Sequence, residues 1–109
     1  MICLGIESTA HTLGVGIINE KGEVLANEKS SFSAKEGGIH PRKAVEHHVL
    51  FYEFVLKRAI AAAHIDLSQV DLIAFSRGPG LGGCLRIGAA AARALATALG
   101  KPIIGVNHC

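Results

Sequence analysis

The chain has 109 residues, half of them hydrophobic and 18% charged, with 13 glycines and no tryptophan. This length allows one domain at most, and the apolar content suffices for a packed core, which excludes a disordered chain. No stretch approaches the roughly 20 apolar residues of a membrane-spanning helix, so we expect no membrane span. The three cysteines show no paired spacing and no basic leader is visible. We therefore expect a reduced, cytoplasmic protein.

The net charge of +2 is too small to mark a nucleic-acid-binding protein, but it is unevenly distributed. Residues 1–71 hold all nine acidic residues, whereas residues 72–109 hold four basic residues and no acidic one. An anionic ligand would favour this C-terminal third, where Arg77, Arg86 and Arg93 lie. The alternative is an ordinary solvated basic helix face.

Three strands are predicted in the first thirty residues, over 2–6, 13–18 and 23–28. The short connections between them are typical of an antiparallel meander. Gly14 and Gly16 within the second strand leave room for a backbone or a ligand to approach closely.

The rest of the chain predicts two helices, each followed by a strand. After a loop over 33–42, a helix is expected over 43–64, then a strand over 71–76, a helix over 84–99 and a strand over 103–106. The first helix has two apolar rows, which predicts packing against the sheet on one side and against something else on the other. The order β-β-β-α-β-α-β predicts an α/β fold with a mixed five-stranded sheet, in which the first, fourth and fifth strands are parallel.

The pattern Gly78-x-Gly80-x-x-Gly83 lies between a predicted strand and a predicted helix, as in dinucleotide-binding proteins. Pro79 stiffens this loop, and no acidic residue follows to hold a ribose. Both features argue against a dinucleotide site. An anion held at the helix N-terminus beside Arg77 and a simple turn remain as alternatives.

Polar residues follow the first strand directly, beginning with Glu7, Ser8 and Thr9. In β-hairpin ATPases such a loop surrounds phosphates with its N–H and hydroxyl groups, while an acid on the first strand orients a metal or water. We predict Glu7 as a catalytic residue and Ser8 and Thr9 as cofactor-binding residues. The alternative is an ordinary hairpin turn beside a structural acid.

Histidines surround the predicted start of the first helix, at His40, His47 and His48. Adjacent helical residues point about 100° apart, so we do not expect His47 and His48 to serve one site. A hydrogen bond that anchors a loop is favoured over metal coordination. Cys84 begins the second helix, where a thiol pKa can be lowered, but simple core packing is the more common role. His108 follows the last strand, at the sheet edge where open α/β sheets bind ligands.

Taken together, four segments resemble the universal tRNA threonylcarbamoyladenosine transferases. They are residues 6–12, 37–42 with 46–48, 76–81 and 101–109. The most similar branch is the catalytic subunit of the archaeal and eukaryotic KEOPS complex, a relative of bacterial TsaD. The same family also carries an older glycoprotease label. Bacterial members have an Asp-Glu pair where this sequence has His11 and Thr12, so the chemistry of that pair is not carried over.

The resemblance implies a ribonuclease-H-like fold of the actin, sugar-kinase and heat-shock ATPase superfamily. Residues 1–109 would form the N-terminal domain, and a second domain would be missing. The implied enzyme is an acyltransferase that moves a threonylcarbamoyl group from threonylcarbamoyl-adenylate to the adenosine beside the tRNA anticodon. It would use a divalent metal, iron or zinc, with His108 as a ligand, and a nucleotide, ATP or the adenylate. We expect the 109-residue piece alone to be inactive.

The resemblance also implies partners. A small dimerising KEOPS subunit would pack against the two helices, the small kinase subunit would bind through the full-length protein, and tRNA would be the substrate. Two other functions are weighed against this one. A phosphoryl-transferring kinase is disfavoured because the first loop lacks a clear Asp-Gly phosphate signature, and a non-catalytic scaffold that docks partner helices stays open.

Overall fold

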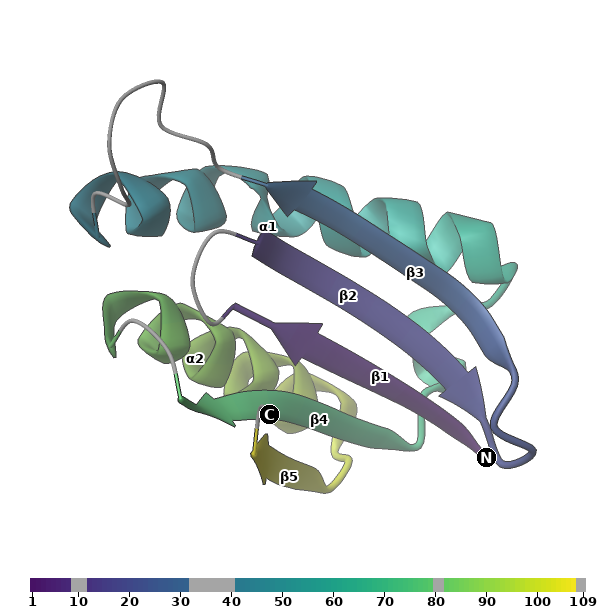
Figure 1. Cartoon of the computed structure of the whole chain (residues 1–109). Coiled ribbons are helices and arrows are strands. Elements are labelled where there is room, and N and C mark those ends of the chain that lie inside the picture. Colours follow the sequence, from purple (N-terminus) through teal and green to yellow (C-terminus); the bar gives the residue numbers. More distant parts are fainter. Residues whose placement is uncertain (9–11, 32–40, 80–81, 108–109) are drawn as a thin grey trace.

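Five strands form one mixed sheet in the order β3-β2-β1-β4-β5 (Figure 1). The computed structural model describes residues 1–8, 12–31, 41–79 and 82–107, without the side chains of residues 41 and 42. The antiparallel strands are β1 (Ile2–Glu7), β2 (Thr12–Asn19) and β3 (Val24–Ser31). The strands parallel to β1 are β4 (Leu72–Gly78) and β5 (Ile103–Asn107). The predicted mixed sheet, with its parallel first, fourth and fifth strands, is confirmed.

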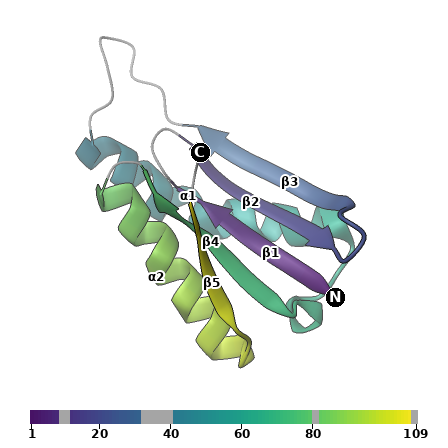
Figure 2. The same ribbon diagram turned by 60° about the horizontal axis from the view of Figure 1, so that its bottom comes forward.

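Both helices, α1 (Pro41–Ala63) and α2 (Gly82–Leu99), pack on the same face of the sheet (Figures 1 and 2). α1 lies against β2 and β3, and α2 lies mainly against β4. Within the described part of the chain, no helix covers the opposite face, which we call the open face. None of the described helices is both long and apolar enough to cross a membrane.

The core lies between the helices and the sheet, because alternate residues of the inner strands point toward the helices. Fully buried side chains come from β1, β2, β4 and α1: Leu4, Leu13, Val15, Ile17, Ile73, Val55 and Ala59. Removing a large apolar side chain of this kind from water contributes about 1.5–3 kcal/mol. This burial fixes which face of the strands is left open.

Element ends differ from the predicted ones by one to three residues. α1 begins at Pro41 rather than residue 43, and it ends before His64, whose φ of 54° is left-handed. α2 ends at Gly100 with φ 64°, and the N–H of Lys101 donates to the carbonyl oxygen of Ala96 at 2.9 Å. A short 3₁₀ helix, η1 (Leu67–Gln69), was not predicted.

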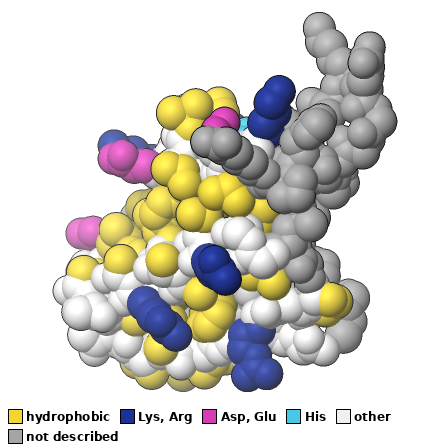
Figure 3. Space-filling model, turned by 90° about the vertical axis from the view of Figure 1, so that its left-hand side faces the viewer, with side chains coloured by type: hydrophobic (Ala, Val, Ile, Leu, Met, Phe, Trp, Pro, Cys, Tyr) yellow, Lys and Arg dark blue, Asp and Glu magenta, His cyan; other side chains and the backbone are white. Residues whose placement is uncertain are grey.

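The buried face of α1 takes residues from both predicted apolar rows, so the rows do not separate a buried side from an exposed one. Val55 and Ala59 face the core, whereas a second group of apolar side chains is exposed, by 37% to 74%. This group, which we call the α1 patch, consists of Val49, Leu50, Phe51 and Phe54. Yellow side chains gather in the upper half of Figure 3. One sheet can cover only one side of a helix, so the α1 patch stays exposed in the described structure.

Candidate functional site

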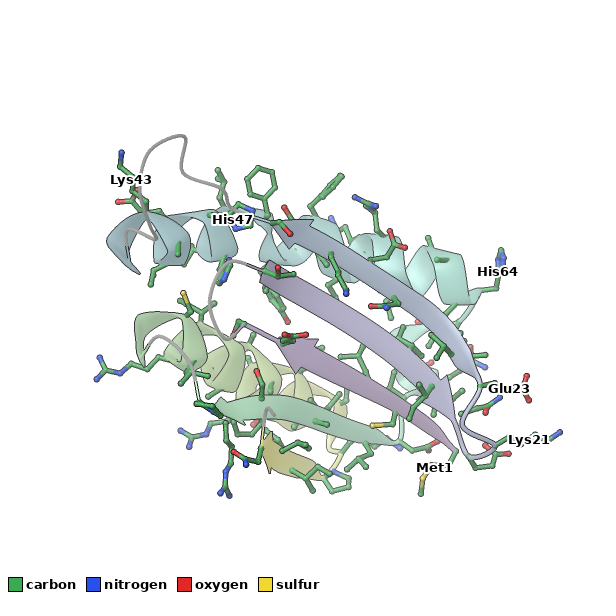
Figure 4. All side chains as sticks on the ribbon, in the orientation of Figure 1. Met1, Lys21, Glu23, Lys43, His47 and His64 are labelled. Atoms are coloured by element: carbon green, nitrogen blue, oxygen red, sulfur yellow. The ribbon has the colours of Figure 1, made fainter. Side chains whose placement is uncertain are left out.

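Three strands end at one edge of the sheet because β1, β4 and β5 are parallel. Glu7 is the last residue of β1, Asn107 is the last of β5, and Ser76 lies near the end of β4. In Figure 4 the labelled Met1 and Glu23 lie at the opposite end of the sheet. The predicted catalytic acid is therefore placed where open α/β sheets bind ligands.

A hollow of about 280 Å³ lies on the open face and reaches this edge. Its floor is formed by Gly5, Gly14 and Gly16, and Gly5 pairs with Gly16 across β1 and β2. A Cβ atom on Gly16 would meet only the carbonyl oxygen of Ala26, at 3.8 Å. The surface is recessed because these residues have no side chain. The expectation that the glycines of the second strand leave room for a close approach is confirmed.

Polar side chains line the hollow beside its glycine floor. They supply one carboxylate, one ammonium group, two amides and one hydroxyl, from Glu7, Lys29, Asn27, Asn107 and Ser76. A Cβ atom on Gly14 would lie 3.9 Å from Cβ of Glu7 and 3.7 Å from Cγ of Lys29, so both side chains flank that glycine. Amides and hydroxyls hydrogen-bond a base or a ribose, and an ammonium group attracts a phosphate. The lining fits a nucleotide chemically.

Ser8 lies on the other side of the sheet from this hollow, although it directly follows Glu7. It is fully buried. Its hydroxyl donates to the carbonyl oxygen of Cys84 at 2.7 Å, and its N–H donates to Oγ of Ser76 at 3.2 Å. A Cβ atom on Gly88 would collide with Oγ of Ser8. Ser8 thus ties the end of β1 to β4 and α2, while its contact with a cofactor stays a prediction.

His47 and His48 face each other rather than diverge. Their Nδ1 atoms lie 2.8 Å apart, and Nε2 of His47 lies 2.9 Å from Oγ of Ser30 on β3. The expectation that two neighbouring imidazoles would point apart was wrong, because their χ rotations bring the rings together despite the 100° between their Cα–Cβ bonds. The hydrogen bond of His47 connects α1 to the end of β3, whereas the predicted anchoring of the loop involves residues outside the described ones. Burial lowers the pKa of His47.

The described residues do not form a metal centre. Among them, no three His, Cys, Asp or Glu side chains are grouped closely enough to hold an ion. The predicted ligand His108 and the predicted cofactor-binding residue Thr9 lie outside the described residues, as does His40. Cys84 is buried, and burial raises the pKa of its thiol, in keeping with core packing.

The sequence matches the TsaD family, described as tRNA N6-adenosine threonylcarbamoyltransferase, over residues 23–109. The chain belongs to this family. It is 56% identical over all 109 residues to the tRNA N6-adenosine threonylcarbamoyltransferase of Thermococcus kodakarensis, and it spans 33% of that relative. It is 51% identical over its whole length to a probable bifunctional tRNA threonylcarbamoyladenosine biosynthesis protein of Methanococcus maripaludis, of which it spans 20%. The TsaD family resemblance seen in the sequence is confirmed.

Solved structures agree on the fold. YeaZ from Pseudomonas aeruginosa superposes with a TM-score of 0.77 at 24% identity, covering 97% of this chain and 42% of YeaZ. Thermus thermophilus RuvC superposes with a TM-score of 0.55 at 18% identity, covering 98% of this chain and 64% of RuvC. At these identities the likeness shows the fold alone. The fold is ribonuclease-H-like, as the family resemblance implied.

Sequence reasoning missed part of the lining of the hollow. Asn27 and Lys29 belong to β3. Their side chains reach the hollow because β3 pairs with β2 in a fixed register. The spacing of two residues between Asn27 and Lys29 could have indicated that their side chains lie together, since residues i and i+2 of a strand lie on the same face. Which face that is depends on the sheet as a whole.

Proposed function

We propose that this chain is part of an enzyme that transfers a threonylcarbamoyl group from threonylcarbamoyl-adenylate to the adenosine beside the anticodon of tRNA. The observation that carries the proposal is the 56% identity to a tRNA N6-adenosine threonylcarbamoyltransferase, which extends over all 109 residues of this chain. The chain spans about a third of that relative. We propose that it forms the N-terminal of two domains and is inactive alone, and that the whole protein acts in the cytoplasm, where tRNA is modified.

In this reaction the amino nitrogen of adenosine forms a bond with the carbamoyl carbon, the bond from that carbon to the adenylate oxygen breaks, and the amino group loses a proton. Glu7 is our candidate for the carboxylate that accepts this proton. Its place at the end of β1, on the lining of the hollow, supports the role. General base catalysis of this kind typically contributes about 10²- to 10⁴-fold to the rate.

We further propose that the whole protein uses a nucleotide, ATP or threonylcarbamoyl-adenylate, and a divalent metal, iron or zinc. The polar lining of the hollow supports a nucleotide. The metal, with His108 as one ligand, rests on the family resemblance alone. Ser8 and Thr9 remain our candidates for cofactor contacts.

We also propose that the small dimerising subunit of KEOPS packs on α1 and on the side of α2 that faces α1, and that the small kinase subunit binds through the whole protein. The exposed α1 patch supports the first interface, because contiguous exposed apolar side chains mark sites of association. Gly83 lets α2 lie close to α1 within this chain, since a Cβ atom there would lie 2.6 Å from Cγ2 of Val45. The same patch would equally serve a helix-docking scaffold without catalysis.

A chimeric protein separates the enzyme from the scaffold. The 109 residues replace the matching residues of the T. kodakarensis relative, and the chimera receives unmodified tRNA, threonine, bicarbonate, ATP and the proteins that form the adenylate. Nucleoside mass spectrometry should detect threonylcarbamoyladenosine with the chimera and none with the 109-residue chain alone. A folded chimera that makes no product, beside an active unmodified relative, would favour the scaffold. The chimera with His108→Ala should also be inactive, and full activity there would remove His108 as a ligand.

A further inference from the structure

Four basic side chains lie on one side of the molecule without acidic neighbours in the sequence. They are Arg77, Arg86, Arg93 and Lys101, and residues 72–107 contain no Asp or Glu. The three arginines are exposed, and Lys101 is half-buried. Dark-blue side chains appear in the lower part of Figure 3, and the magenta ones lie higher. The side of the molecule built from β4, α2 and β5 is therefore positively charged.

Other cations of this chain form ion pairs with acidic side chains within the described structure. The N-terminal amino group pairs with Glu20, Lys57 with Glu53, and Arg58 with Glu28. None of the four cations on the α2 side forms an ion pair with a described residue. Unpaired arginines that share one surface repel one another, so their arrangement does not stabilise the fold of this chain.

Arg77, Arg93 and Lys101 lie beside β5. Arg86 and Arg93 are seven residues apart and so share one face of the helix, about 10 Å apart along its axis. Arg93 lines a hollow with Ile103 of β5, and the side chain of Arg77 lies over Gly105 of β5. Gly83, one helical turn before Arg86, approaches α1 at Val45. The basic face therefore borders the proposed subunit interface at Arg86.

A concave site lies within this basic face. A hollow of about 290 Å³ is lined by Arg93, Thr97, Gly100 and Lys101, together with apolar Ala96 and Ile103. Carbonyl oxygens at a helix C-terminus normally disfavour an anion. Here two of them already accept hydrogen bonds, Ala96 from the N–H of Lys101 and Thr97 from the N–H of Gly100. Two basic residues and a threonine therefore line a hollow large enough for a phosphate with its ribose.

We propose that this basic face, defined by Arg77, Arg86, Arg93 and Lys101, binds the phosphate backbone of tRNA. The choice of an RNA as the polyanion rests on the proposed function. Arginine predominates here, and its planar guanidinium donates two parallel hydrogen bonds to a phosphate. The other exposed residues of the helix surface around Arg86 and Arg93 include Ala90 and Ala94. Their short side chains let a sugar-phosphate backbone approach the arginines.

The test compares two doubly neutralised variants of the 109-residue chain. Arg86→Gln with Arg93→Gln removes two charges from the basic face, and Lys21→Gln with Lys57→Gln removes two exposed charges elsewhere. Fluorescence anisotropy measures the Kd for a labelled tRNA transcript between 50 and 200 mM salt, while circular dichroism melting checks the fold. Each lost phosphate contact lowers the slope of log K against log salt by about 0.7 to 0.9. We expect the arginine pair to lower the slope by roughly 1.5 and weaken binding about tenfold at low salt, and the lysine pair to change neither.

Equal losses in both variants, an unchanged slope in the arginine variant, or no tRNA binding by the unaltered chain would each overturn the proposal. Binding to phosphatidylglycerol vesicles in place of tRNA would assign the face to a membrane instead and also overturn it. Activity of the chimera and tRNA affinity of the arginine variant test the enzymatic function and the basic face separately. If it forms the modified nucleoside while the arginine substitutions leave tRNA affinity intact, only the basic face fails. If the arginine substitutions weaken binding while no product forms, only the enzymatic function fails.

Discussion

The Nδ1 atoms of His47 and His48 lie 2.8 Å apart, although the two residues are neighbours on one helix. One nitrogen must donate a proton and the other must accept it, so the contact requires at least one neutral ring. Burial lowers the pKa of His47 from its ordinary value of 6.5. The unfolded chain therefore binds more protons than the folded one just below pH 6.5, and the free energy of unfolding should fall as the pH falls from 7 to 5.

Thermal melting at pH 5, 6 and 7 measures this dependence. His47→Gln keeps hydrogen-bonding groups near Ser30 and removes the titrating ring, so its melting temperature should vary less with pH than that of the unaltered chain. His64→Asn is the matched control, because His64 is exposed and Asn tolerates its left-handed φ of 54°. An unchanged pH dependence in His47→Gln would show that this ring does not titrate with folding.

Ser8 and Gly88 should be energetically coupled. Gly88→Ala places a methyl group against Oγ of Ser8 and should cost about 1–3 kcal/mol of stability, as overpacking of a core does. Ser8→Ala loses the hydrogen bond to Cys84 and should cost about 1 kcal/mol. In the double variant the hydroxyl is absent, so Gly88→Ala should cost less there than in the unaltered chain. Urea denaturation of all four proteins measures the coupling.

Gly82→Ala controls for a methyl group added to the same helix, since nothing lies within 4 Å of that position. It should leave stability unchanged or raise it by less than about 1 kcal/mol. Strictly additive free energies for the Ser8 and Gly88 substitutions would contradict the contact between them.

Glu7→Gln should reduce threonylcarbamoyladenosine formation by the chimera at least about tenfold, because the amide keeps the shape of the side chain but accepts no proton at neutral pH. The matched control is Glu23→Gln, an exposed acid at the other end of the sheet (Figure 4). Melting temperatures and product formation are measured together for both variants. Full activity of a folded Glu7→Gln chimera would remove Glu7 from the catalytic residues.

The α1 patch should be required for binding of the small dimerising subunit. Leu50→Glu introduces a charge where the side chain is 74% exposed, so the fold should persist. An interface that buries this residue should then weaken at least about tenfold, because the carboxylate would lose its water. Lys21→Glu, exposed in the turn between β2 and β3 and away from α1, serves as the control for charge. Co-purification of the subunit with each variant of the chimera measures the effect, and equal recovery with Leu50→Glu would exclude this part of α1 from the interface.

Local patterns in the sequence were sufficient for the order of strands and helices. Apolar runs of strand length, turn residues between them and the stop at Gly100 and Pro102 are properties of neighbouring residues. The parallel pairing of β4 with β1 followed from the handedness of crossovers. The 3₁₀ helix η1, which follows α1, was not predicted because three residues are too few to show a periodic pattern.

The surroundings of the candidate site depended on long-range contacts. The sequence placed Glu7 and Ser8 together in one polar loop, but the pleat of the strand sends consecutive residues to opposite faces, so Glu7 lines the open hollow and Ser8 is buried against α2. Lys29 joins Glu7 only through the pairing of β3 with β2. Likewise, the meeting of His47 and His48 depended on side-chain rotation beside Ser30.

By itself, the sequence determined the mixed α/β fold, the family and the separation of charge along the chain, because each is encoded in residue type and local spacing. Only the tertiary structure decided that Arg77, Arg93 and Lys101 gather beside β5 and that the α1 patch stays exposed. That arrangement depends on how α2 is rotated about its axis when its small residues pack against the sheet. No local pattern fixes such a rotation, since it follows from packing between residues far apart in the chain.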